Sequence, residues 1–185
     1  MKRLGYVFLV FMTFPIYISA QDWVKFSPPG QPFEILCPGQ MKNAEKKLLT
    51  EVGEMHPVTW VYQGNENESN YIYSISYVDY PEGTFHADSI ELIDEFFKVS
   101  MDSHIKDLHG ELVYTTPDNY YSYPGLLYRV SYNKNKAVAK SRMILAGDRF
   151  YALQVYTISE KSLNQDIDKF LNSFEIKKNK TKRKR

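Results

Sequence analysis

Residues 137–157 read AVAKSRMILAGDRFYALQVYT and carry the clearest structural signal in the chain. Two mostly apolar runs, residues 137–145 and 150–157, flank Gly147-Asp148, a dipeptide typical of tight hairpin turns. In the second run apolar side chains occupy both faces: Tyr151, Leu153 and Val155 on one, and Phe150, Ala152 and Tyr156 on the other. This pattern predicts a hairpin whose second strand lies centrally in a sheet covered on both sides.

Further extended segments lie on either side of this hairpin. Apolar or alternating runs bounded by Pro, Gly and Asn predict strands at residues 23–26, 33–37, 58–62, 71–79, 111–116, 126–132 and 173–176. The polar residues 64–70 predict a hairpin loop. Residues 40–56 have the weakest pattern, and we expect one strand there, from about residue 45 to residue 52.

Two helices are expected between these strands. In the first, Asp88 and Glu91 have capping-box spacing, and Ile90, Ile93, Phe97 and Met101 share one face, which Leu92, Phe96 and Val99 widen. In the second, Ser162 and Gln165 are the expected caps for a face made of Leu163, Ile167, Phe170 and Leu171. The order of elements predicts an α+β domain, a mainly antiparallel sheet covered by two helices.

The N-terminus has the pattern of a secretory signal peptide. Lys2 and Arg3 precede an apolar run that ends at Ser19-Ala20. The run is shorter than the roughly 20 residues that a membrane-spanning helix needs. We expect cleavage near Ala20, an exported protein in the periplasm or outside the cell, and no transmembrane helix in the mature chain.

The near-neutral total, 23 Lys and Arg against 22 Asp and Glu, combines regions of unlike charge. Residues 21–176, the expected single domain, hold 14 basic and 22 acidic side chains. Residues 177–185 form an expected disordered basic tail with Lys177, Lys178, Lys180, Lys182, Arg183, Lys184 and Arg185. The tail is either solvated or a tether to an anionic surface. Because the signal peptide conflicts with nuclear localisation, we do not expect a nucleic-acid partner.

The sequence shows no motif for catalysis, metal or cofactor binding. Cys37 is a lone cysteine, so it cannot form an intramolecular disulfide, and its alternation with Phe33 and Ile35 indicates burial. None of His56, His86, His104 and His109 is spaced as a helical zinc pair. No nucleophile elbow, phosphate-binding loop or dinucleotide motif occurs. We therefore expect no metal and no cofactor.

Tyrosine is overrepresented, with 15 in 185 residues. Two sets, Tyr71, Tyr73 and Tyr77 in one strand and Tyr128 and Tyr132 in another, alternate and are expected to pack in the fold. Three others, Tyr120, Tyr121 and Tyr123, cluster in a loop bounded by Pro and Gly. Loop tyrosines supply contact area with a polar group, so these are the candidate binding residues, with a lid over the core as the alternative.

Several short motifs resemble the PsbP-like and DcrB-like extracytoplasmic domains, and they occur in order over residues 22–176. They are Phe33-Glu34-Ile35-Leu36-Cys37-Pro38-Gly39, Tyr77-Val78-Asp79-Tyr80-Pro81, Tyr123-Pro124-Gly125 with Tyr128, Arg142 to Leu145 with the stretch from Gly147 to Leu153, and Phe170 to Ile176. The resemblance implies an α/β/α sandwich, usually a small non-enzymatic module of the periplasm or thylakoid lumen. It transfers no catalytic residue, because the matching positions are structural.

These observations favour an exported, non-catalytic binding or assembly module of the cell envelope, with an envelope protein or small ligand as its partner. One alternative is a secreted hydrolase whose carboxylates and histidine come together on folding. The other is an envelope protein held on an anionic surface by its basic tail.

Overall fold

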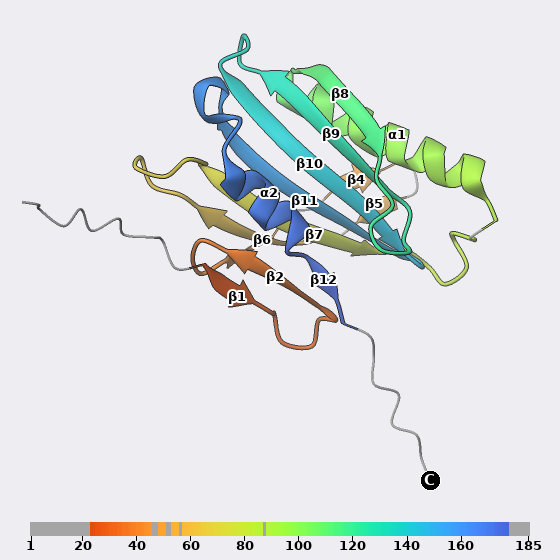
Figure 1. The fold of residues 1–185 in the computed structure, drawn as a ribbon. Helices are drawn as coiled ribbons and strands as arrows, with labels where there is room; N and C mark the ends of the chain where they lie inside the picture. The colour runs from red at the N-terminus through yellow and green to blue at the C-terminus, as the bar shows by residue number, and fades with distance from the viewer. Residues whose placement is uncertain (1–22, 46–47, 51–52, 56, 87, 178–185) are drawn as a thin grey trace, which may run out of the picture.

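The computed structural model of the protein describes residues 23–45, 48–50, 53–55, 57–86 and 88–177. Within them a seven-stranded sheet with antiparallel neighbours forms the framework (Figure 1). Its strands are, from edge to edge, β3 (Lys42–Glu45), β6 (Val58–Gln63), β7 (Ile72–Asp79), β11 (Arg149–Ile158), β10 (Ala137–Ala146), β9 (Gly125–Tyr132) and β8 (Glu111–Pro117). The expected signal peptide and the tail beyond Lys177 lie outside the described residues.

Strands β10 and β11 form the expected hairpin. Ala146 pairs with Arg149 across the Gly147-Asp148 turn, and Gly147 has a φ of 63°, which glycine adopts without a steric penalty. Strand β11 is the fourth of the seven, and its side chains contribute to the packed clusters on both faces of the sheet. The prediction of a central strand covered on both sides is confirmed.

One face of the large sheet is covered by a second sheet and a short helix. The second sheet consists of β1 (Val24–Phe26), β2 (Phe33–Cys37) and β12 (Glu175–Ile176), and the helix is α2 (Gln165–Asn172), which follows the 3₁₀ turn η1 (Ser159–Lys161) (Figure 1). Phe33, Ile35 and Phe170 from this layer are buried against Tyr73 and Leu153 of the sheet. The hydrophobic effect therefore joins segments more than 100 residues apart in sequence.

Aromatic rings account for much of this core. Phe33 is fully buried, and its ring centroid lies 5.7 Å from Trp60, 5.8 Å from Tyr151 and 5.7 Å from Phe174. Such edge-on and tilted contacts add to the burial of apolar area. Tyr73, Tyr77 and Tyr128 are buried, as their alternation predicts, so the tyrosine excess is largely a packing feature. The prediction was wrong for Tyr71, which precedes β7 and is exposed.

Helix α1 (Ile90–Leu108) covers the opposite face of the sheet (Figure 1). Ile93, Phe97 and Met101 pack on Tyr128 and Val130 of β9, as the helical spacing predicts. The prediction was wrong for Ile90 on this face and for Leu92 and Val99 in the wider apolar arc, which are exposed, whereas Phe96 of the arc packs against the cluster as expected. The expected capping box was also wrong, since Ser89 is the N-cap residue and its side chain makes no capping hydrogen bond.

The start of α2 differs from the prediction in the same way. Asn164, rather than Ser162, is the N-cap residue, and its Oδ1 accepts hydrogen bonds from the backbone N–H groups of Asp166 and Ile167. Leu163 therefore lies before the helix and is 91% exposed, so its assignment to the buried face was wrong.

The region after β3 also departs from the prediction of a single strand at residues 45–52. Strand β3 ends at Glu45, and β4 (Leu48–Thr50) pairs with β5 (Gly53–Met55) as a separate two-stranded sheet. Residues 46–47, 51–52 and 56 lie outside the described residues. The predicted class, an α+β fold with a large antiparallel sheet and two helices, is confirmed.

Candidate functional site

The three clustered tyrosines form a tight turn between β8 and β9. The backbone N–H of Tyr120 donates to the carbonyl of Tyr123 at 2.9 Å, and the reverse bond is 3.0 Å. Tyr121, at the tip, has a φ of 56°, in the left-handed region that a bulky side chain rarely adopts. Backbone strain of this kind persists only where the surrounding structure holds it, and it concentrates at functional positions.

Tyr120 anchors this turn to the body of the protein. Its hydroxyl donates to the carbonyl oxygens of Phe174 at 2.7 Å and Asn172 at 3.0 Å, and its ring tilts against the ring of Phe174. Burial raises the pKa of Tyr120 to about 12, so the hydroxyl stays protonated and able to donate at neutral pH. Of the three predicted binding residues, Tyr120 therefore holds the loop in place.

Arg142 of β10 lies beneath Tyr120. The centre of its guanidinium group is 4.6 Å from the Tyr120 ring centroid, within the range of a cation–π contact. Its Nε donates to Asp118 at 2.6 Å, and its Nη1 donates to the carbonyl of Leu171 at 2.6 Å and to Oδ1 of Asn172 at 3.0 Å. A buried charge with this many partners fixes the loop, β10 and the end of α2 relative to one another.

The sequence reasoning did not identify Arg142 as part of the site. Its position in the sequence could have pointed to such a role, because Arg142 is a charged residue in the otherwise apolar end of a predicted central strand. A charged side chain that is buried there must find hydrogen-bond partners.

Tyr121 and Tyr123 are the loop residues that remain accessible. The Tyr121 side chain is 76% exposed, and its ring meets that of Tyr120 edge-on at 5.0 Å. Tyr123 is half-buried and forms one wall of an open pocket. The loop thus presents one exposed and one half-buried aromatic ring on an anchored backbone. The alternative of a lid over the core fits Tyr120 and Tyr123, which both pack against the core, and does not fit the exposed Tyr121.

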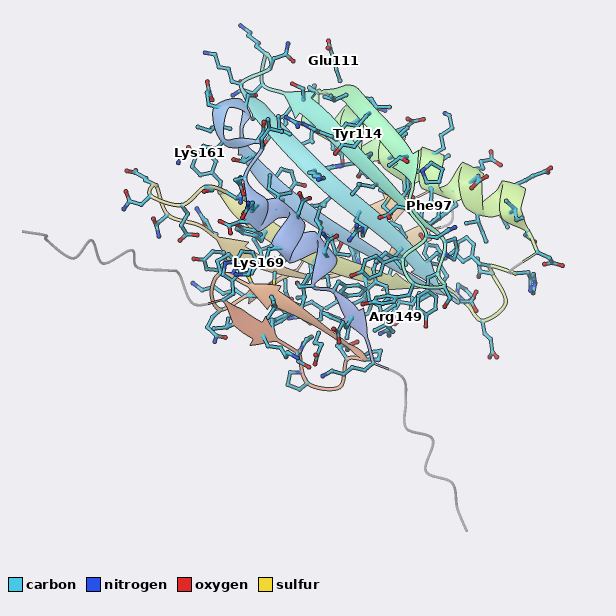
Figure 2. The ribbon with its side chains drawn as sticks, in the orientation of Figure 1. Phe97, Glu111, Tyr114, Arg149, Lys161 and Lys169 are labelled. Atoms are coloured by element: carbon cyan, nitrogen blue, oxygen red, sulfur yellow. The ribbon has the colours of Figure 1, made fainter. Side chains whose placement is uncertain are left out.

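The open pocket beside Tyr123 has a volume of about 400 Å³. Three parts of the chain contribute to it: the second sheet, the turn of the β10–β11 hairpin and the tyrosine loop. Its lining residues are Pro32, Tyr123, Ala146, Gly147, Arg149, Tyr151, Ile176 and Lys177. Figure 2 shows Arg149 near the lower end of the large sheet, close to β12. The walls are therefore mainly apolar and aromatic, with two cationic side chains.

Both cations of the pocket have anionic partners within the protein. Nη2 of Arg149 donates to Asp79 at 2.7 Å, and its guanidinium lies 4.3 Å from the ring centroid of Tyr77. The hydrogen bond to Asp79 raises the pKa of Arg149 further, so the charge is permanent. Lys177, the first residue of the predicted basic tail, lies 3.2 Å from Glu34. The pocket therefore offers apolar contact area more than free positive charge.

The predicted lack of a reactive cysteine agrees with the environment of Cys37. The side chain is fully buried, and burial raises the pKa of its thiol to about 11, which disfavours the nucleophilic thiolate. Among the residues that the structure describes, no group of three or more His, Cys, Asp and Glu side chains is arranged to hold a metal ion.

His104 is part of a polar cluster that sequence reasoning missed. Its ring nitrogens lie 2.8 Å from the hydroxyl of Tyr128 and 3.1 Å from the hydroxyl of Tyr156, which itself donates to Gln154 at 2.9 Å. Burial raises the pKa of Tyr128 to about 12. These contacts join α1 to the sheet through the hydroxyl groups of Tyr128 in β9 and Tyr156 in β11.

Within the described part of the chain, no helix is long and apolar enough to span a membrane. Neither a protein-family model nor a curated protein sequence matches the chain. Among solved structures, the chain is similar to the solution structure of cyanobacterial PsbP (CyanoP) from Synechocystis sp. PCC 6803. The match has a TM-score of 0.54 and 15% sequence identity, and it covers 86% of this chain and 95% of that one. The protein therefore has a PsbP-like fold.

Proposed function

We propose that this protein is an exported, non-catalytic binding or assembly module of the cell envelope, which contacts an envelope protein or small ligand through Tyr121 and Tyr123. The observation that carries the proposal is the exposed Tyr121 ring, held on a left-handed backbone beside the pocket that Tyr123 lines. Apart from its edge-on contact with Tyr120, most of this side chain faces solvent, so its surface is available to a partner.

The anchoring of the loop supports a recognition role. The hydroxyl of Tyr120 and the guanidinium of Arg142 bind four backbone or side-chain groups at and just after the end of α2, so the turn is ordered before any partner arrives. A pre-ordered loop loses less conformational entropy on binding, which raises affinity for a given contact area. Tyrosine is suited to this role because it offers a large amphipathic surface with few rotatable bonds.

The cellular setting rests on two further lines of support. The PsbP-like fold is consistent with a small extracytoplasmic module, as is the DcrB-like resemblance of the sequence motifs. The expected signal peptide at residues 1–20 supports export. Anchoring through the basic tail stays a prediction, because Lys178 to Arg185 lie outside the described residues.

A pull-down from envelope extracts with the tagged full chain tests the proposal. Tyr121→Asn is the test variant, because asparagine tolerates the left-handed backbone while the substitution replaces the phenol group with a small amide. Tyr71→Asn is the matched control, since Tyr71 is an exposed tyrosine just before β7, remote from the loop. We expect Tyr121→Asn to reduce recovery of the specific partner by about tenfold and Tyr71→Asn to leave it unchanged. Equal recovery with both variants would refute the assignment of the loop.

A further inference from the structure

The large sheet has an open edge at β8. This strand is the last of the seven, pairs with β9 alone within the described residues, and is exposed at all seven positions. Leu112, Val113 and Tyr114 place apolar groups on it, and Figure 2 shows Glu111 and Tyr114 on this outer strand. An edge strand presents a row of unpaired N–H and C=O groups, which an extended peptide can satisfy.

A second pocket, of about 280 Å³, lies beside this edge on the α2 side of the sheet. Its floor is a row of side chains that the sheet register places next to one another, since Tyr114 pairs with Arg129 and Arg129 pairs with Lys140. Its rim comes from the segment that leads into α2 and includes the exposed Leu163. The pocket is therefore reached directly from the open edge.

Arg129 differs from the other arginines that the structure describes. Arg142 binds Asp118 and Arg149 binds Asp79, whereas Arg129 has no carboxylate partner among the described residues. Its Nη2 donates to the neutral hydroxyl of Ser162 at 2.7 Å, and its buried Nε has no hydrogen-bond partner there. A guanidinium group with unused donors favours a carboxylate, which it can bind in a bidentate manner.

The other charged groups around the pocket do not neutralise Arg129, so its preference for a carboxylate remains. Asp168 lies in the pocket, but its Oδ1 already accepts from Nζ of Lys140 at 2.6 Å. Asn164, the N-cap of α2, is also in the rim, so the positive end of the helix dipole lies nearby. The pocket is thus net positive and complementary to an acidic group.

We propose that β8 accepts an extended, acidic segment of a partner protein as an additional antiparallel or parallel strand, with a carboxylate directed to Arg129. Neighbouring strands are about 4.8 Å apart, so a residue opposite Tyr114 on the added strand lies roughly 10 Å from the backbone of Arg129. The side chains of Arg and Glu together span that separation. Tyr114 and Leu163 supply apolar contacts beside the ion pair.

Charge favours such a partner over a second copy of the chain. Pairing of two β8 strands would bring a second Arg129 with no carboxylate partner to the same junction. The single acidic residue of β8, Glu111, lies at the end of the strand.

The test uses a blocked heptapeptide, Thr-Val-Thr-Glu-Thr-Val-Thr, and its counterpart with Gln in place of Glu. Each is titrated into the isotopically labelled full chain and followed through backbone amide resonances. We expect shifts to concentrate in β8 and the Glu peptide to bind about fivefold more tightly than the Gln peptide. Arg129→Gln should abolish that preference, and Arg129→Lys, which keeps the charge and guards against misfolding, should retain part of it.

Three outcomes would overturn the proposal. The first is the absence of shifts in β8 at millimolar concentrations of the Glu peptide. The second is a preference for Glu that persists in Arg129→Gln. The third is a change in β8 resonances that depends on protein concentration without peptide, which would assign the edge to a second copy of the chain.

Discussion

Two arginines lie at opposite ends of α2 on the same face of the sheet, and their environments are opposite. Arg142, at the C-terminal end, binds Asp118, the carbonyl of Leu171 and the side chain of Asn172. Arg129, at the N-terminal end, binds the hydroxyl of Ser162 and keeps a buried Nε without a hydrogen-bond partner among the described residues. Arg142 therefore stabilises the fold at one end of α2, whereas Arg129 at the other end can still bind an acidic ligand.

The helix itself explains part of this difference. The last turn of a helix exposes carbonyl oxygens and the negative end of the dipole, so a guanidinium group there finds acceptors. The first turn exposes N–H groups, which cannot accept hydrogen bonds, and in α2 Asn164 already caps two of them. An arginine beside the first turn therefore needs an acceptor from elsewhere, and the structure leaves room for one at the β8 edge.

The largest expected effect on stability follows from replacing Arg142, the arginine with an anionic partner. Arg142→Met leaves Asp118 half-buried without its cation and the Leu171 carbonyl without its donor. Breaking a buried ion pair on one side costs several kcal/mol, so we expect the free energy of unfolding in urea to fall by about 3 kcal/mol. Arg129→Met is the matched control, with an expected change below about 1 kcal/mol. Equal losses would remove the distinction between the two ends.

A smaller effect is expected from the hydroxyl that completes the Arg142 cluster. Tyr120→Phe keeps the ring over the guanidinium group but removes the donor to the carbonyls of Phe174 and Asn172. One hydrogen bond contributes on the order of 1 kcal/mol, which sets the expected loss in urea unfolding at neutral pH. Tyr121→Phe is the control, because the exposed Tyr121 side chain should leave stability unchanged. A loss with Tyr121→Phe as large as that with Tyr120→Phe would contradict the anchoring role.

The same hydroxyl predicts a pH dependence. Burial raises the pKa of Tyr120 to about 12, above the value near 10 of an unfolded chain, so the unfolded state loses this proton first. The stabilisation is therefore complete below pH 10 and is lost as the pH rises towards 12. Tyr128, whose pKa is also raised to about 12, adds to this loss, so Tyr120→Phe should flatten the decline only in part. A decline of unchanged steepness between pH 10 and 12 would contradict the burial of Tyr120.

The smallest expected effect concerns the strained tip of the loop. Tyr121→Asn replaces a bulky residue at a φ of 56° with one that tolerates this conformation. Relief of strain and loss of the contact with Tyr120 oppose each other, so we expect the melting temperature to change by only a few degrees. A large fall would mean that Tyr121 is a packing residue, and it would remove the basis for a recognition surface.

The regular elements were predictable because their signals are local. Alternation along residues 150–157 and helical spacing of Ile93, Phe97 and Met101 arise from the geometry of each element and the need to bury one face. The PsbP-like resemblance of the motifs is confirmed at the level of the fold. The helix starts were missed because neighbouring polar residues, Asp88 and Ser89 or Ser162 and Asn164, compete as caps, and tertiary contacts decide between them.

For the candidate site, the sequence predicted which loop is involved but not the role of each of its residues. The clustering of Tyr120, Tyr121 and Tyr123 located the loop, but the division into an anchor and accessible rings depends on contacts with Arg142 and Phe174, remote in sequence. The missing partner of Arg129 likewise depends on how α2 meets the sheet. No local pattern reports whether a charged side chain finds its counterion after folding.

The central claim, that Tyr121 and Tyr123 contact an envelope component, is tested most directly by site-specific photo-crosslinking in cells that export the full chain. A photoreactive phenylalanine replaces Tyr121, Tyr123 or, as the control, the remote and exposed Tyr71. We predict a specific crosslinked product from positions 121 and 123 and none from position 71. No product from position 121, or the same product from position 71, would contradict the account.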